Sequence, residues 1–143
     1  MRYLGGRTEA FVRAKRWAEA HAPHEVRDWL QDAEDDVDVP YEPQIGFVKI
    51  AFTHAFRHLL RGSDYTEALT ETLAGGGDTD TNACIVGGLL GTACGAEAIP
   101  VGMRQAVLEC DTSKGQQRPP FVSASQIPHL VEELLDPGAQ VGP

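Results

Sequence analysis

The stretch "GGGDTDTNACIVGGLLG", residues 75–91, decides how the fold of this chain is read. Three glycines lead into two aspartates that alternate with two threonines, and an apolar run with further glycines follows. Glycine permits the positive φ angles of a tight turn, and aspartate and threonine commonly begin helices. The pattern therefore predicts a turn and then a helix over residues 80–96, with a dense group of side-chain oxygen atoms at the helix start.

That group of oxygen atoms has two interpretations. As helix caps, Asp78 and Asp80 place negative charge at the positive end of a helix dipole. As metal ligands, Asp78, Asp80 and Thr81 offer hard oxygen atoms, which suit magnesium, manganese or calcium and not zinc. A divalent ion there must overcome the helix dipole, so we expect it to need further carboxylates. The motif by itself leaves both interpretations open.

Other metal and phosphate motifs do not fit the sequence. An EF-hand loop beginning at Asp78 would need glycine and glutamate where Ala83 and Leu89 stand. A P-loop would need Gly-Lys-Ser or Gly-Lys-Thr after the glycines, and that sequence is absent. His54 and His58 have helical spacing but lack the glutamate of the HExxH zinc motif. We expect them to be histidines at the edge of the core or on the surface.

The remaining sequence predicts an all-α fold. Apolar residues recur with a period near 3.6 over residues 44–61, which predicts a central helix. The acidic segment 32–43 contains two prolines and is expected to be a solvated loop. No segment shows the alternation of a strand, so we expect one domain over residues 1–143 with a disordered tail at 136–143. Further helices are predicted at residues 8–20, 23–34, 65–73 and 101–110, and from Ser123 or Ser125 to Leu135.

Local signals define the ends and the packing of these helices. Gly62 is placed to end the central helix. Ser63 or Asp64 can begin the next helix, with Glu67 as the capping-box partner of Asp64. Three glycines spaced four residues apart leave one face of the following helix almost without side chains, so a neighbouring helix can approach closely. These are Gly87, Gly91 and Gly95.

Composition restricts the class of protein and its partners. The chain has 143 residues and a formal net charge of −9 without a Lys/Arg cluster, so neither nucleic acid nor an anionic membrane is an expected partner. Cys84, Cys94 and Cys110 show no disulfide spacing and are interpreted as small buried hydrophobic residues. Trp17 and Trp29 are expected to anchor the core or an interface. No signal-peptide region is found, and a cytoplasmic location is expected.

The motif and its flanks resemble the ADP-ribosylglycohydrolase family. The sequence "GGGDTDTNACIVGGLLGTACGAEAIP" at residues 75–100 is similar to the C-terminal signature of that family. The preceding "GFVKIAFTHAFRHLLRGSDYTEALTETL", residues 46–73, resembles its helix pair, and "IPHLVEELL", residues 127–135, its closing helix. The resemblance is best over residues 44–135 and implies an all-α domain of orthogonal helices, similar to the C-terminal part of the family fold.

The resemblance also implies a chemistry. Members hold two magnesium or manganese ions and hydrolyse the N- or O-glycosidic bond between ADP-ribose and an acceptor. Asp78, Asp80 and Thr81 match metal ligands, while Thr79 and Asn82 match the motif without a ligand role. The metal ions would position the ribose hydroxyl groups and a water molecule. The implied substrate is an ADP-ribosylated protein or a small ADP-ribose derivative, and the motif does not assign catalytic or substrate-binding residues.

One part of the family pattern is absent. Members carry a second acidic cluster, Ser/Thr-Asp-Asp, near the N-terminus, whereas Asp35 and Asp36 here follow Glu34. We therefore expect the C-terminal half of such an enzyme, with weak metal binding and little hydrolase activity on its own. Three arrangements follow. The chain pairs with a separate N-terminal half, or serves as a truncated non-enzymatic interaction module, or forms a homodimer.

Overall fold

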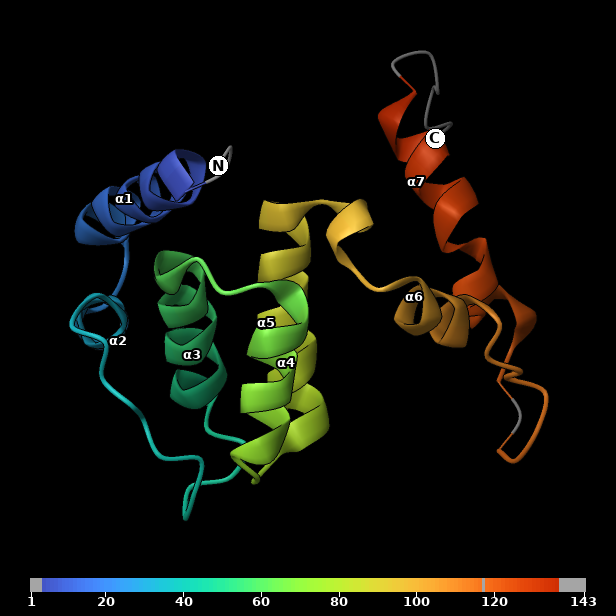
Figure 1. The fold of residues 1–143 in the computed structure, drawn as a ribbon, viewed down its shortest axis with the longest axis horizontal. Coiled ribbons are helices and arrows are strands. Elements are labelled where there is room, and N and C mark those ends of the chain that lie inside the picture. The colour runs from blue at the N-terminus through green and yellow to red at the C-terminus, as the bar shows by residue number, and fades with distance from the viewer. Residues whose placement is uncertain (1–3, 117, 137–143) are drawn as a thin grey trace. The chain divides into compact units, whose positions relative to one another are not determined.

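A computed structural model of the protein describes residues 4–116 and 118–136, and its regular elements there are all helical (Figure 1). The prediction of an all-α fold is confirmed. The predicted tail at 136–143 lies, except for Asp136, outside the described residues. The helices are α1 (Leu4–His21), α2 (His24–Glu34), α3 (Val48–Arg61), α4 (Tyr65–Ala74), α5 (Thr79–Cys94), α6 (Val101–Leu108) and α7 (Ile127–Leu135), with short 3₁₀ turns at Ala96–Ala98, Pro120–Val122 and Ala124–Gln126.

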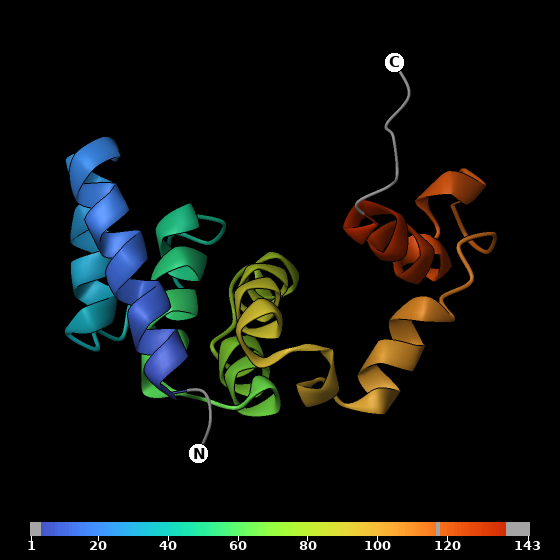
Figure 2. The same cartoon turned by 90° about the horizontal axis from the view of Figure 1, so that it is seen from above.

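The chain divides into two compact units, Met1–Ile99 and Pro100–Pro143. In the first unit, α3 packs against α1, α2 and α5, and α4 packs along α5. Figure 1 shows α3, α4 and α5 running in similar directions while α1 runs crosswise, and Figure 2 shows α1 beside α2. In the second unit, α6 and α7 both contact the 3₁₀ turn Ala124–Gln126. Within the described ranges, no helix combines the length and the apolar character needed to cross a membrane.

The core of the first unit forms where α3 meets its neighbours. Phe11 of α1 and Phe56 of α3 pack edge to face with ring centroids 5.9 Å apart. Leu30, Leu59 and Leu90 bring α2, α3 and α5 into the same cluster. The predicted central helix is confirmed, but its predicted start at residue 44 is wrong. The helix begins at Val48, because Gly46 has a φ of +78° and interrupts helical geometry just before it.

The predicted helix ends are confirmed at α3 and α4. Gly62 adopts the left-handed conformation, with φ of 71°, and ends α3. Asp64, rather than Ser63, begins α4, and it forms the capping box with Glu67. At the other end of the chain, neither Ser123 nor Ser125 caps α7, because the helix follows directly on a 3₁₀ turn, Ala124–Gln126, which begins after Ser123 and contains Ser125.

The predicted close packing along the glycine face of α5 is confirmed at two of its three glycines. A Cβ atom at Gly87 would lie 3.0 Å from the Tyr65 hydroxyl oxygen, and one at Gly91 would lie 3.8 Å from the ring of Tyr65. α4 can therefore approach α5 closely along these glycines. Gly95 lies beyond the helix, where its φ of +83° helps to end α5, so its predicted packing role is wrong.

Several predictions of burial are wrong. Cys84 and Cys110 are exposed and Cys94 is half-buried, because their positions do not face the core. Trp29 packs against Phe47 and Phe52 as predicted for a core anchor. Trp17 is 62% exposed and stacks on His21, so it lies outside the core and its role at an interface stays a prediction. The two histidines of α3, predicted at the core edge or surface, are fully buried because other helices cover α3 on several sides. Their exposed fractions are 1% for His54 and 0% for His58.

Candidate metal site

Asp78 stands at the junction between the glycine turn and α5. It precedes the first helical residue, Thr79, and so occupies the N-cap position, yet its carboxylate makes no capping hydrogen bond. Asp64 at the start of α4 is the contrasting case, because its carboxylate accepts a hydrogen bond from the Glu67 N–H at 2.7 Å. The capping interpretation is therefore wrong for the Asp78 side chain, which is free to engage another partner.

The carboxyl groups of Asp78 and Asp80 converge. Asp78 lies within hydrogen-bonding reach of Asp80 and is the main cause of a lowered Asp80 pKa, with the Thr81 N–H as the next cause. That N–H donates to Asp80 Oδ1 at 2.9 Å, so Asp80 satisfies one free amide of the first helical turn. Two carboxylates at such close range repel each other unless a proton or a cation lies between them.

The other residues of the motif complete the local structure. Asn82 is 2% exposed, and its backbone N–H donates to the Asp78 carbonyl oxygen at 3.0 Å. Its side-chain nitrogen is buried without a hydrogen-bond partner. Thr81 is exposed beside Asp80, while Thr79 is half-buried. The three residues predicted as ligands therefore lie together at the start of α5, Asp78 as the N-cap and Asp80 and Thr81 on the first turn.

The number of ligands is small for a divalent ion. Over residues 4–116 and 118–136, no group of three or more histidine, cysteine or acidic side chains is placed to hold a metal. The carboxylates and the Thr81 hydroxyl are of the type that Mg²⁺ and Mn²⁺ accept, so they fit one side of such an ion. Water or residues from elsewhere would have to complete its coordination.

Asp36, from the other acidic stretch of the chain, is engaged in ion pairs. Its carboxylate accepts hydrogen bonds from Arg57 Nε at 2.9 Å and from Arg61 Nε at 2.6 Å. These bonds lower the pKa of Asp36 to about 2, and the bond from Arg61 has the larger effect. Its partners are arginines on α3, so the structure gives Asp36 a structural role and places it with the helix rather than with Asp78.

The segment between α2 and α3 borders the site, which the sequence did not indicate. Figure 1 shows this segment reaching the same end of the unit as the turn between α4 and α5. A Cβ atom at Gly77 would lie 2.8 Å from the Tyr41 carbonyl oxygen, and one at Gly46 would lie 3.6 Å from Asp78 Oδ2. An open hollow of about 460 Å³ adjoins the same place and is lined by residues 44–47.

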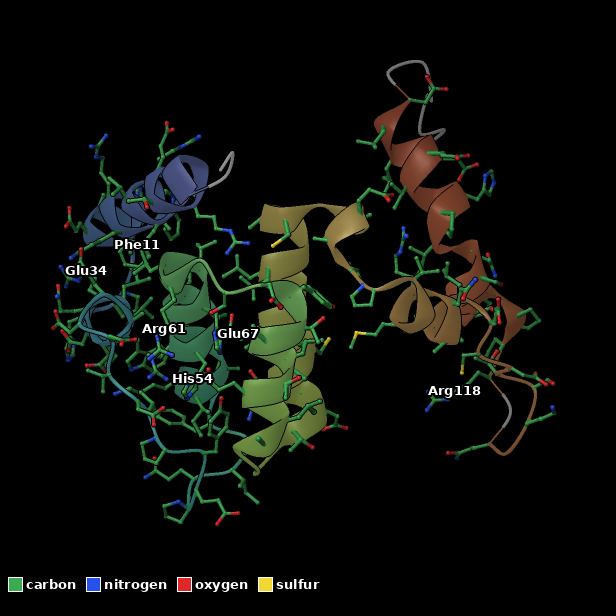
Figure 3. All side chains as sticks on the ribbon, viewed as in Figure 1. Phe11, Glu34, His54, Arg61, Glu67 and Arg118 are labelled. Carbon is green, nitrogen blue, oxygen red and sulfur yellow. The ribbon has the colours of Figure 1, made fainter. Side chains whose placement is uncertain are left out.

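Tyr41 and His54 connect this segment to α3. Their rings stack with centroids 4.4 Å apart, and His54 Nε2 donates to the Val39 carbonyl oxygen at 2.7 Å. Figure 3 labels His54 on α3, in the part of the unit where the segment enters the helix. The expectation of a solvated loop is wrong at Tyr41, which is half-buried. An aromatic residue between two prolines was the signal that could have indicated this.

Each of the two buried histidines has a structural partner for one of its ring nitrogens. His58 Nδ1 lies 3.1 Å from the Ser63 hydroxyl oxygen, and His54 is held by Val39 and Tyr41. Burial lowers the pKa of both imidazoles. Both histidines are therefore neutral near pH 7 and contribute to packing.

Comparison with known proteins bears on the family of the chain. A family model described as ADP-ribosylglycohydrolase matches residues 2–140. A protein of Acanthamoeba polyphaga mimivirus, named a "putative ADP-ribosyl glycohydrolase", is 40% identical over 78 residues, which make up 54% of this chain and 23% of that protein. The chain thus matches about a quarter of that relative's length. No solved structure matches this chain. From the helical fold, the Asp-Thr-Asp-Thr turn and the match over nearly its whole length, the chain belongs to the ADP-ribosylglycohydrolase family.

Proposed function

We propose that this chain supplies one side of a metal centre that hydrolyses the glycosidic bond between ADP-ribose and a modified acceptor. Asp78, Asp80 and Thr81 would hold Mg²⁺ or Mn²⁺. The observation that carries this is the Asp78 carboxylate, which is free of capping bonds and converges on Asp80. When bound, the metal would orient hydroxyl groups of the ribose and polarise the reacting centre. The substrate would be an ADP-ribosylated protein or a small ADP-ribose derivative.

The electrostatics of the helix end explain why two carboxylates are needed. The start of α5 carries partial positive charge from its free N–H groups, which opposes a cation. Asp80 neutralises part of that charge through its bond with the Thr81 N–H. Asp78, which makes no bond to the helix, can then direct its charge to the ion.

The hollow beside Asp78 offers space for part of a substrate. It is lined by residues 44–47, and Ile45 and Phe47 expose 62% and 42% of their surfaces. An apolar surface next to a pair of carboxylates suits a ligand with a flat or apolar part joined to hydroxyl groups. ADP-ribose has both features, so this hollow supports the proposed substrate class.

The metal site is tested by titrating Mn²⁺ into the protein by calorimetry. We expect weak binding by the wild-type chain and a loss of about tenfold or more, ~1.4 kcal/mol or more, in Asp78→Ala, because one of two carboxylates is removed. Asp111→Ala is the matched control, since Asp111 is an exposed aspartate outside the motif whose carboxylate accepts hydrogen bonds from Ser113. Equal binding by wild type and Asp78→Ala would contradict the proposal.

The same ligand count bears on catalysis. Because the described part of the chain holds no group of three ligands, we expect little release of ADP-ribose from a modified arginine or serine by this chain alone. A separate polypeptide that supplies the missing acidic cluster would restore activity.

The alternative is a non-enzymatic interaction module that pairs with a partner or with a second copy. The apolar surface of α7 favours it, because Leu134 and Leu135 are 82% and 77% exposed. Native mass spectrometry distinguishes the two functions. A stable homodimer without metal favours the module, whereas a co-purifying N-terminal half favours the enzyme.

A further inference from the structure

Tyr41 is held between α3 and the glycine turn. One face of its ring stacks on His54 with an interplanar angle of 10°. A Cβ atom at Gly75 would lie 2.2 Å from Tyr41 Cε2, which means that only glycine allows the ring to lie where it does. Gly75 itself has ordinary helical angles, φ −65° and ψ −21°, which any residue can adopt. The absence of a side chain is therefore needed to make room for the Tyr41 ring and is not needed for the backbone conformation.

The same segment contacts the turn that carries Asp78. Gly77, the residue before Asp78, lies against the carbonyl group of Tyr41 and the side chain of Ile45. Gly46 lies against the Asp78 carboxylate itself. The position of the turn, and so of the first carboxylate, depends on where Tyr41 holds this segment.

We propose that Tyr41 is a positioning residue for the metal site, and that its ring, fixed between His54 and Gly75, sets the approach of Asp78 to Asp80. The inference rests on the proposed function, because it assigns to the ring a role in metal affinity. Tyr41 does not touch the metal. It acts through the glycine turn, whose three consecutive glycines would otherwise leave Asp78 free to adopt many orientations.

A purely structural role for the ring is the competing explanation. Phe11 provides the matched control, because it is a buried aromatic residue of the same unit, packs against Phe56 and is well separated from His54 in Figure 3. If metal affinity followed stability alone, Phe11→Ala would weaken it as much as Tyr41→Ala. If Tyr41 positions the carboxylates, Tyr41→Ala weakens metal binding and Phe11→Ala does not.

Mn²⁺ affinity is measured for five variants of the full chain. We expect Tyr41→Ala and Gly75→Ala to weaken binding by about tenfold, the loss that is typical when a residue that orients a ligand is removed. Tyr41→Phe keeps the ring and should bind within about twofold of wild type, well below the roughly tenfold or greater loss that removal of an orienting group causes. Gly88→Ala adds the same methyl group as Gly75→Ala but in open space, and should also bind normally. Phe11→Ala should lose stability and keep its affinity.

The outcomes separate this inference from the proposed function. If Asp78→Ala loses Mn²⁺ while Tyr41→Ala and Gly75→Ala bind like wild type, the metal site stands and the positioning role is overturned. Equal losses in Phe11→Ala and Tyr41→Ala overturn it as well. If Tyr41→Ala does not fold, Gly75→Ala decides the question.

A second measurement needs no metal. Amide resonances of residues 76–80 in the metal-free protein should shift in Tyr41→Ala and Gly75→Ala, and should stay in place in Phe11→Ala and Gly88→Ala. If the wild-type chain binds no Mn²⁺, the proposed function fails. These resonances still report whether Tyr41 and Gly75 set the position of the glycine turn. Unchanged resonances in both Tyr41→Ala and Gly75→Ala would overturn the positioning role.

Discussion

At the residue scale, two aspartates in equivalent positions have different roles. Asp64 and Asp78 both precede the first residue of a helix, but only Asp64 accepts a hydrogen bond from the helix. Asp64 is followed three residues later by Glu67, whose carboxylate returns the bond, whereas Asp78 is followed by Thr81. The capping box stabilises α4, while the carboxylate of Asp78 points to Asp80. The same residue type therefore serves stability at one helix and the candidate site at the next.

The buried histidines predict how stability depends on pH. Burial lowers the pKa of His54 and His58 below 6.5, so the unfolded chain binds protons more readily than the folded protein. Stability is therefore complete above pH 6.5 and is lost as the pH falls through the lowered folded pKa values. Urea unfolding at pH 7.5 and 5.5 measures this loss, which His54→Gln should reduce and the exposed-site control His24→Gln should not. An unchanged pH dependence in His54→Gln would contradict it.

Asp36 affects stability in a different pH range. Its pKa is lowered from 3.8 to about 2 by Arg61 and Arg57, so its contribution is present above pH 3.8 and is lost only as the pH falls towards 2. The side chain is largely exposed, and solvent screens its ion pairs. Among the described groups with a shifted pKa, His54 and His58 are the ones that titrate near pH 6, so we attribute the loss of stability there to them.

At the element scale, the contact between α4 and α5 depends on the missing side chain of Gly87. The Tyr65 hydroxyl oxygen and Leu69 Cδ2 would lie 3.0 and 3.3 Å from a Cβ atom there. The neighbouring Gly88 has no atom within 4 Å of such a Cβ. Two adjacent glycines of one helix therefore differ in function, because one permits close packing and the other only faces solvent.

Alanine substitution of these two glycines measures the packing. We expect Gly88→Ala to stabilise the protein by up to about 1 kcal/mol, the helix propensity difference between glycine and alanine. Gly87→Ala should gain less or lose stability, because Tyr65 must move to admit the methyl group. The difference in unfolding free energy between the two variants is the packing contribution. Equal stabilisation by both substitutions would show that α4 does not press against Gly87.

At the scale of the whole molecule, the two units differ in how many of their hydrophobic side chains are buried. All the buried hydrophobic side chains of the described residues lie in Met1–Ile99. The described residues of Pro100–Pro143 include none that is fully buried, and exposed apolar side chains lie on both of its helices, Val101 and Val107 on α6 and Leu130 and Leu134 on α7. A unit with little burial cannot offset the conformational entropy of its own folding.

Fragments of the chain test this difference. We expect residues 1–99 alone to unfold cooperatively in urea with helical circular dichroism close to that of the same unit in the full chain. Residues 100–143 alone should show little helix and no cooperative transition, because isolated helices of eight or nine residues are unstable in water. A stable, cooperative fold of the second fragment would contradict the prediction. Loss of structure in the first would mean that its core needs the second unit.

The sequence by itself determined the helices, the turn and the family. Apolar periodicity indicated α3, the residues Asp64 and Glu67 indicated the start of α4, and the glycines of 75–77 indicated the turn before α5. Each of these signals lies within a few neighbouring residues, where backbone preferences and capping act. The metal motif is also contiguous, so its residues could be named without the fold, although their role as ligands stays a prediction.

Only the tertiary structure decided which side chains support that motif. Whether Asp78 caps α5 or turns to Asp80 depends on competing hydrogen bonds whose lengths no local pattern specifies. The burial of His54 follows from the helices that surround α3. Tyr41 reaches Gly75 across 34 residues of chain, and Gly46 reaches Asp78 across 32. Contacts between segments so distant in sequence arise from the packing of α3, α4 and α5, which periodicity predicts as elements but does not place in space.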